Sequence, residues 1–197
     1  MGTSYFVLVN VLVIGSGGRE HALSWKLSQS SKVETVFTAP GNGGTENNIS
    51  IDVNDLDGLA EFAQKNNCFT VVGPEDPLAA GIVDKFNELN LKVFGPSQAA
   101  AQLESSKIWA KNFMKRNNIP TARFEIFDDP QKAEEHVKSI DYNVVVKADG
   151  LAAGKGVIVC NSDDEAISAI QTILVKKTFG DAGNKIIIEE RIDRYDF

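Results

Sequence analysis

The chain has 197 residues, of which 43% are hydrophobic and 24% charged, a composition that excludes a disordered chain and allows one large or two small domains. Lys and Arg number 20 against 27 Asp and Glu, and the net charge of −7 argues against broad binding of nucleic acid or anionic membranes. Two widely spaced cysteines, no signal peptide and no membrane-length apolar run predict a soluble cytoplasmic protein without disulfides or a zinc site.

Apolar runs of strand length alternate with helical periodicity through the first hundred residues, a pattern typical of a parallel sheet covered by helices. Glycine-rich or proline-rich loops follow the first three strands. The pattern predicts a Rossmann-like α/β domain over residues 1–103. Its predicted strands are 5–14, 33–38, 69–72 and 92–94, and its predicted helices lie near 19–29, 56–65 and 78–89.

The pattern changes after this domain. Residues 98–117 are mostly helical, and a turn follows them, so we assign 104–121 to a helical linker. The remainder predicts a small α+β subdomain over 122–192 and a divergent tail at 193–197. Its predicted strands are 123–127, 144–148, 157–160 and 185–189, with one helix capped by Asp129 before Pro130 and another over 164–176.

Gly15, Gly17 and Gly18 lie in a loop that leaves the first strand and opens a helix. Such glycines let backbone N–H groups approach an anion at the positive end of the helix dipole, so a phosphate is the natural ligand. Glu20 replaces the third glycine of the dinucleotide fingerprint, which disfavours a nicotinamide cofactor. A tight turn that only packs the helix against the strand is the alternative interpretation.

Pro74, Glu75 and Asp76 follow the third predicted strand, at the sheet edge where open α/β sheets bind ligands. Two adjacent carboxylates there could hold hydroxyl groups or an amine. The prolines stiffen the segment, which suits a binding site and a simple turn equally well.

Residues 144–159 form a predicted glycine-rich hairpin that carries Lys147 and Lys155. A strand follows the glycines, which distinguishes the hairpin from a Walker loop. Such a tip can fold over a triphosphate, with both lysines facing the phosphates. A loose hairpin with two solvated lysines is the alternative.

Together these residues resemble the phosphoribosylamine-glycine ligase family, also called glycinamide ribonucleotide synthetases, which are ATP-grasp enzymes of purine biosynthesis. The match begins with Gly-Ser-Gly-Gly-Arg-Glu-His-Ala at residues 15–22 and runs from about residue 11 to residue 193. Further motifs follow in the family's order at 40–44, 73–81, 95–97, 104–107 and 147–156. Linked motifs in one order are more specific than any single motif.

The resemblance implies a reaction in which ATP and magnesium activate the carboxylate of glycine as an acyl phosphate. The amine of phosphoribosylamine then attacks, releasing ADP and phosphate. The implied substrate-binding residues are Gly15, Gly17, Gly18, Arg19, Glu20, Pro74, Glu75 and Asp76. The implied ATP-binding residues are Lys107, Lys147, Gly150, Leu151, Ala152, Gly154, Lys155, Gly156, Glu189, Glu190 and Ile192, the last three holding adenine.

After Asp193 the chain departs from the family pattern, with Arg194 where glycine is expected and an end at Phe197. We therefore expect the second half of the ATP-grasp to be absent, together with the magnesium ligands and catalytic residues. We assign no metal or catalytic residue here, and we expect no turnover by these residues alone.

Whether the chain is a fragment or a natural short form stays open, as does its fusion or association with other purine-pathway domains. The expected partners are small-molecule substrates, with no nucleic acid and no membrane. A related ATP-grasp carboxylase is disfavoured by residues 19–22 and 73–81. A non-catalytic nucleotide-binding or phosphate-binding module, or an interaction fragment, is the alternative function.

Overall fold

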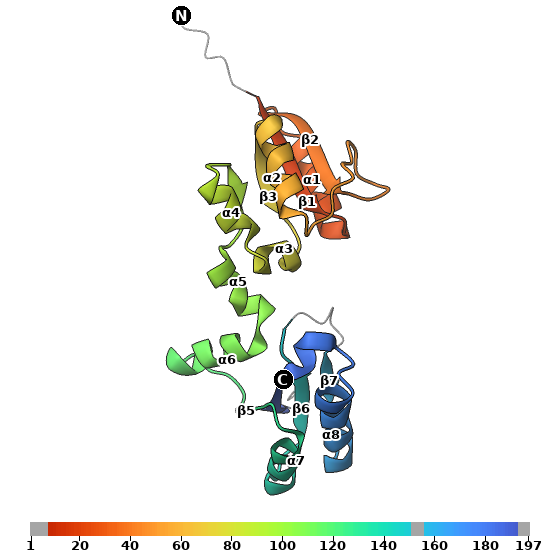
Figure 1. The fold of residues 1–197 in the computed structure, drawn as a ribbon, viewed down its shortest axis with the longest axis vertical. Helices are drawn as coiled ribbons and strands as arrows, with labels where there is room; N and C mark the ends of the chain where they lie inside the picture. Colours follow the sequence, from red (N-terminus) through yellow and green to blue (C-terminus); the bar gives the residue numbers. More distant parts are fainter. Residues whose placement is uncertain (1–7, 151–155, 193–197) are drawn as a thin grey trace, which may run out of the picture. The chain divides into compact units, whose positions relative to one another are not determined.

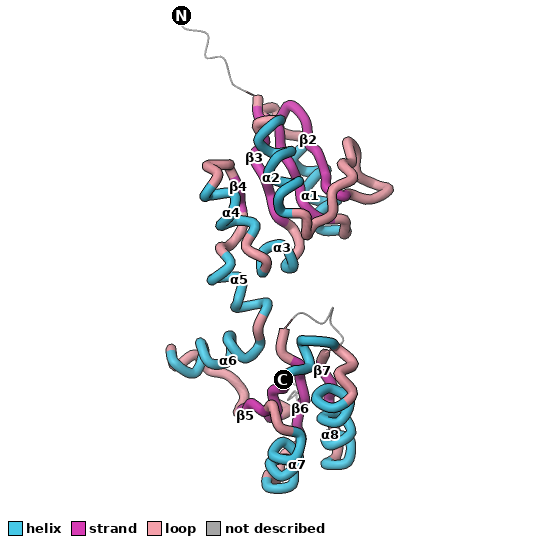
Figure 2. Tube along the Cα trace, in the orientation of Figure 1, coloured by secondary structure: helices cyan, strands magenta, loops and turns pink. Residues whose placement is uncertain are grey.

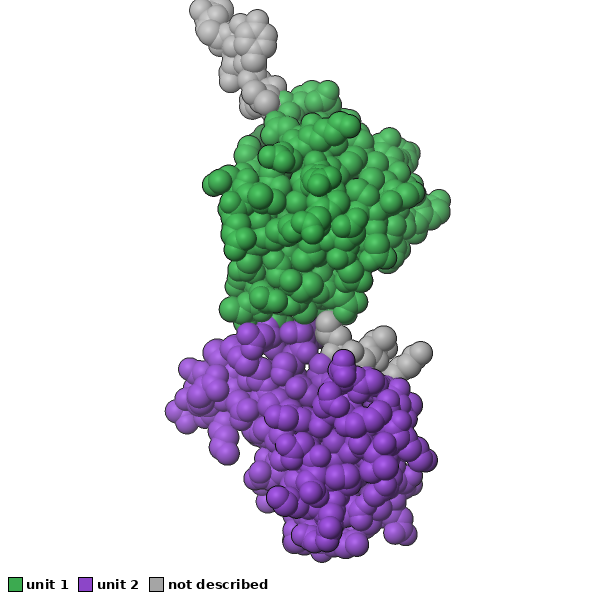
Figure 3. All heavy atoms as spheres, viewed as in Figure 1, with its two compact units in different colours: residues 1–101 green, residues 102–197 purple. Residues whose placement is uncertain are grey.

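The computed structural model describes residues 8–150 and 156–192. The chain divides into two compact units, residues 1–101 and 102–197 (Figure 3). Each unit has its own four-stranded sheet, with two hydrophobic cores in the first unit and one in the second. No helix in the described residues is long and apolar enough to cross a membrane.

The first unit is built on a parallel sheet with the strand order β2-β1-β3-β4, of which β1, β2 and β3 are labelled in Figure 1. Its strands are β1 (Val9–Gly15), β2 (Val33–Pro40), β3 (Cys68–Val72) and β4 (Val93–Phe94). Its helices are α1 (Gly18–Ser28), α2 (Leu56–Lys65), α3 (Glu75–Ala79) and α4 (Ile82–Glu88). This alternation confirms the predicted Rossmann-like α/β fold.

Alternate residues of the central strand β1 supply two separate cores. Leu12 and Ile14 pack with α2 and α4, whereas Val11 and Val13 pack with α1 on the opposite face. All four side chains are at most 3% exposed. Because helices cover both faces, residues 11–14 of the strand are a continuous apolar run rather than an alternating one.

The prediction of one helix over 78–89 is wrong, since α3 and α4 are separate helices (Figure 2). Gly81 lies between them with a φ of +89°, a left-handed conformation that only glycine adopts readily. The apolar periodicity continues across this break, which hides it in the sequence. Glu75 and Asp76, predicted in a loop, therefore lie in the first turn of α3.

The second unit contains an antiparallel sheet with the strand order β5-β8-β6-β7. Its strands are β5 (Phe124–Phe127), β6 (Val144–Ala148), β7 (Val157–Val159) and β8 (Ile186–Glu190). Its helices are α6 (Lys107–Arg116), α7 (Pro130–Ser139) and α8 (Asp163–Ile170), followed by a π-helix at Gln171–Val175 and a 3-10 helix at Gly180–Asn184. Helix α5 (Gln98–Ser105) spans the division between the units. This arrangement confirms the predicted α+β subdomain.

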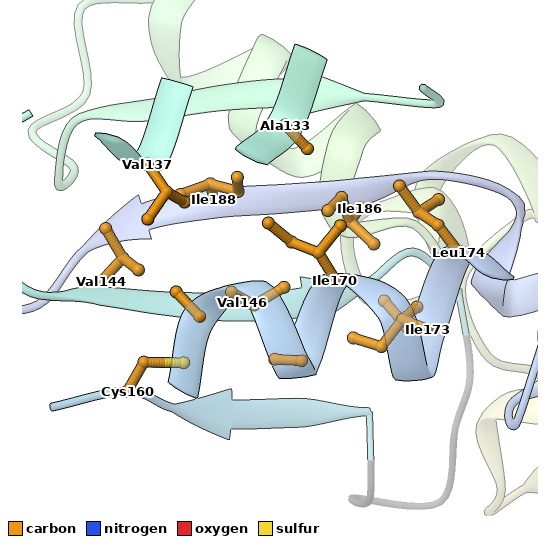
Figure 4. Close-up of a cluster of buried hydrophobic side chains, with 13 residues drawn as sticks. Ala133, Val137, Val144, Val146, Cys160, Ile170, Ile173, Leu174, Ile186 and Ile188 are labelled. Atoms are coloured by element: carbon orange, nitrogen blue, oxygen red, sulfur yellow. The ribbon is translucent and has the colours of Figure 1, made fainter. Parts of the chain in front are cut away.

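Helices α7 and α8 cover one face of this second sheet (Figure 4). Val146, Ile186 and Ile188 point into the core on that face. Because successive side chains of a strand point to opposite faces, Lys147 and Glu189 lie on the other face. The polar residues that interrupt these apolar strands thus share one side of the sheet.

Local capping explains several helix boundaries. The Asp129 carboxylate accepts the N–H of Lys132 at 2.9 Å, which confirms the predicted cap of α7. Ser106 interrupts the predicted helical stretch 98–117, because its hydroxyl accepts the N–H of Trp109 and starts α6. The predicted helix 164–176 is α-helical only to Ile170.

Candidate functional site

A carboxylate from helix α1 organises the glycine loop between β1 and α1. Glu20 is only 3% exposed, and its Oε2 accepts the N–H of Gly17 at 2.8 Å. Its Oε1 accepts the Nε–H of Arg19 at 2.7 Å. A carboxylate in the first turn also interacts favourably with the positive end of the helix dipole. Glu20 therefore occupies the anion position beside the Gly17 N–H.

Two glycines make room for this carboxylate. A Cβ at Gly15 or at Gly73 would overlap the side chain of Glu20. Gly15 ends β1 and Gly73 follows β3, and these two strands are neighbours in the sheet. Gly18 is different, because a Cβ there would meet nothing within 4 Å. The space for an external anion is thus at Gly18 rather than at Gly17.

Arg19 extends this cluster toward the second predicted substrate segment. Its Nη2 lies 3.4 Å from Oε2 of Glu75. Burial raises the pKa of the Glu20 carboxyl, but the hydrogen bonds from Arg19 and from the Gly17 N–H outweigh burial and hold the pKa below its ordinary value. Glu20 is therefore ionised at neutral pH, and it orients the Arg19 guanidinium.

Asn42, which the site prediction omitted, holds the glycine loop from the segment after β2. Its Nδ2 donates to the carbonyl oxygen of Ser16 at 2.9 Å and to that of Gly17 at 3.3 Å. The signal in the sequence was its place among the glycines of 40–44. Pro74 and Asp76 flank Glu75 at the start of α3.

The structure thus brings six predicted substrate residues, from Gly15 to Glu20 together with Glu75, into one region of the first unit.

A separate pocket of about 350 Å³ is lined by α1, β2 and the loop after β2, including His21, Trp25 and Glu34. None of the eight predicted substrate residues, all of which the structure describes, lines that pocket.

In the second unit, the Glu189 carboxylate lies between two lysine ammonium groups. Nζ of Lys147 lies 2.6 Å from Oε2 of Glu189, and Nζ of Lys111 lies 2.7 Å from Oε1. Lys147 is opposite Ile187 in the β6–β8 ladder, so Glu189 is its diagonal neighbour on the same face. We call Lys111, Lys147 and Glu189 the lysine–glutamate triad.

Lys111 was not among the predicted site residues. It comes from α6, its side chain is 11% exposed, and its Nζ also donates to Oγ1 of Thr121 at 2.6 Å. Lysines are seldom buried to this extent unless they are paired. The sequence feature that could have indicated Lys111 is its position one helical turn after Lys107, which is a predicted site residue.

The charges of the triad do not cancel. Burial raises the pKa of the Glu189 carboxyl, but the hydrogen bonds from Lys111 and Lys147 outweigh it and keep the pKa below its ordinary value. Two ammonium groups and one carboxylate therefore leave one positive charge in excess. Such an excess in a half-buried site favours an anionic ligand.

Asp149 joins the end of β6 to the start of α6. Its Oδ1 accepts the N–H of Ile108 at 3.1 Å and the hydroxyl of Ser106 at 3.1 Å. Nζ of Lys107 donates to the carbonyl oxygen of Gly150 at 3.0 Å. The contacts hold Lys107 beside the first residue of the predicted phosphate-binding segment. Asp149 lies inside the motif at 147–156 but is not among the predicted site residues.

The other predicted ATP-binding residues are placed differently. Glu190 pairs with Arg123 through two hydrogen bonds of 2.9 Å, and Ile192 is exposed. The carbonyl oxygen of Gly156 accepts the N–H of Ala148 at 2.7 Å and closes the β6–β7 hairpin. Four predicted residues, Leu151, Ala152, Gly154 and Lys155, lie outside the described residues. Within the described ranges, no three His, Cys, Asp or Glu side chains are grouped as metal ligands.

The fold, together with the match of residues 105–197 to an ATP-grasp domain model, defines a class, the ATP-grasp ligases. The biotin carboxylase domain of the 2-oxoglutarate carboxylase from Hydrogenobacter thermophilus has the same fold, with a TM-score of 0.71 over 95% of this chain and 45% of that one, at 18% identity. The crystal structure of phosphoribosylamine–glycine ligase from Thermotoga maritima is more similar in sequence. It gives a TM-score of 0.74 at 33% identity, over 94% of this chain and 44% of that one.

Family models match both units. Residues 9–104 match the N domain of phosphoribosylglycinamide synthetase, and residues 105–197 match its ATP-grasp (A) domain. The chain is 55% identical to phosphoribosylamine–glycine ligase from Neisseria meningitidis serogroup B over 92% of its length, and 51% identical to that from Pseudomonas aeruginosa over 94%. The chain belongs to the phosphoribosylglycinamide synthetase family, which confirms the resemblance. It spans 44% of the length of each of these two relatives.

Proposed function

We propose that this chain supplies the amino-terminal part of an ATP-dependent ligase that joins glycine to 5-phosphoribosylamine, yielding glycinamide ribonucleotide, ADP and phosphate. The match of both units to one synthetase family supports this activity. The observation that carries the proposal is the excess positive charge of the lysine–glutamate triad, next to the strand and glycine segment that the family resemblance assigns to ATP.

In this proposal the second unit binds ATP. Lys107 and Lys147 contact the phosphates, together with the segment that begins at Gly150. Glu189, Glu190 and Ile192 hold adenine, with Glu189 accepting a hydrogen bond from its amino group. The ATP-grasp class uses ATP with magnesium, and the Hydrogenobacter domain was crystallised with MgADP. Magnesium would neutralise phosphate charge during transfer of the γ-phosphoryl group.

The first unit would bind phosphoribosylamine. Its phosphate would approach the N-terminus of α1 at Gly18, where the backbone is unobstructed, and would pair with Arg19. Glu20 would act indirectly, because its side chain is only 4% exposed and holds Arg19 and the Gly17 N–H. Glu75 and Asp76, in the first turn of α3, would hold the sugar and the amine.

We also infer that the protein works in the cytoplasm on small-molecule substrates. Its two cysteines are buried free thiols, which suits a reducing compartment.

The test is calorimetry on the 197-residue protein with two probes, ribose 5-phosphate and ATP with magnesium. Gly18→Val places a branched side chain where the phosphate would approach, and nothing in the described structure obstructs that side chain. We expect at least a tenfold loss of affinity for ribose 5-phosphate, by the order of magnitude of one lost charge-assisted contact. ATP affinity should not change, since its proposed site lies in the other unit.

Unchanged affinity for ribose 5-phosphate in a folded Gly18→Val protein would refute the assignment of the first unit. If the wild-type protein bound neither probe, the interaction-fragment alternative would replace the ligase proposal.

A further inference from the structure

We propose that Lys111 is a positioning residue for nucleotide binding, which fixes the Glu189 carboxylate and prevents that carboxylate from neutralising Lys147. The inference rests on the proposed function, in which Lys147 and Glu189 contact ATP. Neither the motifs of the sequence nor the implied ATP-binding set includes Lys111.

The contacts of Lys111 are suited to holding neighbouring side chains in place rather than to binding a ligand. Its Nζ donates to Thr121 at 2.6 Å and to Glu189 at 2.7 Å, and it lies 5.4 Å from the centroid of the Phe124 ring. Phe124 is directly opposite Glu189 in the β5–β8 ladder. An ammonium group has three N–H donors, and these two oxygens and the ring face engage it on three sides. Lys111 therefore acts through Glu189.

The two lysines of the triad differ in access. The Lys147 side chain is 25% exposed, whereas that of Lys111 is 11% exposed. Each lysine takes one oxygen of the Glu189 carboxylate. A ligand that enters this face would consequently reach Lys147 more readily than Lys111.

The charge balance at Glu189 depends on Lys111. Among the described residues, the charged groups that face this carboxylate are Lys111 from α6 and Lys147 from β6, and on β5 the facing residue is the uncharged Phe124. With Lys111 present, one positive charge remains for a phosphate. Without it, Lys147 and Glu189 form a neutral pair, and Lys147 is drawn toward both carboxylate oxygens. Removal of Lys111 should therefore weaken phosphate binding by Lys147.

The orientation of Glu189 affects base selectivity as well. An ionised carboxylate only accepts hydrogen bonds, so it suits the amino group of adenine and repels the carbonyl oxygen that guanine carries at the equivalent position. A Glu189 side chain released from Lys111 would discriminate less between the two bases.

The experiment compares Lys111→Met, Lys111→Arg and Lys115→Met in the 197-residue protein. Methionine keeps most of the side-chain volume without the charge or the donors, and arginine restores both. Lys115 is the matched control, because it lies one turn later on α6 and 5.9 Å from the same Phe124 ring, without an ion pair to a described carboxylate. Calorimetry with ATP and with GTP, each with magnesium, gives the affinities.

We expect Lys111→Met to weaken ATP binding about tenfold, the order of one charge-assisted hydrogen bond, and to weaken GTP binding less. The ratio of the ATP affinity to the GTP affinity should therefore decrease. Lys111→Arg should recover most of the ATP affinity, and Lys115→Met should match the wild type. Wild-type affinities and selectivity in a folded Lys111→Met protein would overturn the inference.

A second measurement needs no nucleotide. Carbon-13 NMR of the Glu189 carboxyl should show a higher pKa in Lys111→Met than in the wild type, since burial remains and one cation is lost. An unchanged Glu189 titration would show that Lys111 does not control Glu189. A wild-type protein that bound no ATP would refute the proposed function, while this titration would still decide the coupling of Lys111 to Glu189.

Discussion

Replacement of Glu20 by glutamine tests whether a buried carboxylate holds the glycine loop together. Glutamine has nearly the same volume, but one of its two terminal atoms is an N–H donor. In Glu20→Gln that donor faces either the Gly17 N–H or the Arg19 guanidinium, both of which are donors themselves. One of the two hydrogen bonds is therefore lost, whichever way the amide turns.

The size of the effect follows from these contacts. A buried hydrogen bond to a charged group contributes about 1.5–3 kcal/mol to stability. The Arg19 side chain is 58% exposed, so its ion pair with Glu20 adds no more than about 1 kcal/mol because solvent screens it. We expect Glu20→Gln to lower the free energy of unfolding of the first unit by about 2 kcal/mol at neutral pH.

The effect should depend on pH with a definite sign. The folded-state pKa of Glu20 lies below its ordinary value of 4.5, so its ionisation stabilises the fold above that value. This contribution is lost as the pH falls through the folded-state pKa. The difference between the wild type and Glu20→Gln should consequently shrink below pH 4.5.

Urea denaturation followed through Trp25 fluorescence, in a Trp109→Phe background, reports on the first unit because Trp25 lies in α1. Glu61→Gln, at an exposed position of α2, is the control and should change stability by less than about 0.5 kcal/mol. A Glu20→Gln protein as stable as this control at pH 7 would refute the role assigned to Glu20. So would a difference that grows as the pH is lowered.

Three further predictions concern packing and reactivity. Gly73→Ala puts a methyl group where the Glu20 side chain lies, so the free energy of unfolding of the first unit should fall by about 1–3 kcal/mol in the same urea assay. Wild-type stability would mean that the Glu20 side chain can move aside without destabilising the unit. Ile170→Ala empties a fully buried position of the second core and should cost about 2–5 kcal/mol by calorimetric unfolding, whereas Leu103→Ala, at an exposed position, should cost little. Burial raises the pKa of the Cys68 thiol to about 11, so a disulfide reagent near neutral pH should label Cys68 only after denaturation, and rapid labelling of the native protein would contradict this.

Elements whose signals are local could be predicted from the amino-acid pattern alone. Strand β6 and helix α2 begin and end at the predicted residues, because an uninterrupted apolar run and a capped amphipathic stretch need no distant partner to be recognised. The glycine motifs likewise placed the site residues at strand ends. The break at Gly81 escaped detection because it depends on one backbone angle and leaves the apolar periodicity intact.

Which side chains meet at the site depends on the packing of the whole unit. Glu20 fills the space at Gly73 because β1 and β3 are neighbours in the sheet, and no local pattern specifies that neighbourhood. Lys111 is 78 positions from Glu189, and the two meet because the Lys111 side chain reaches from α6 to the Glu189 carboxylate. Strand alternation assigns a side chain to a face, whereas sheet order and register, which arise from packing the whole unit, determine its partner.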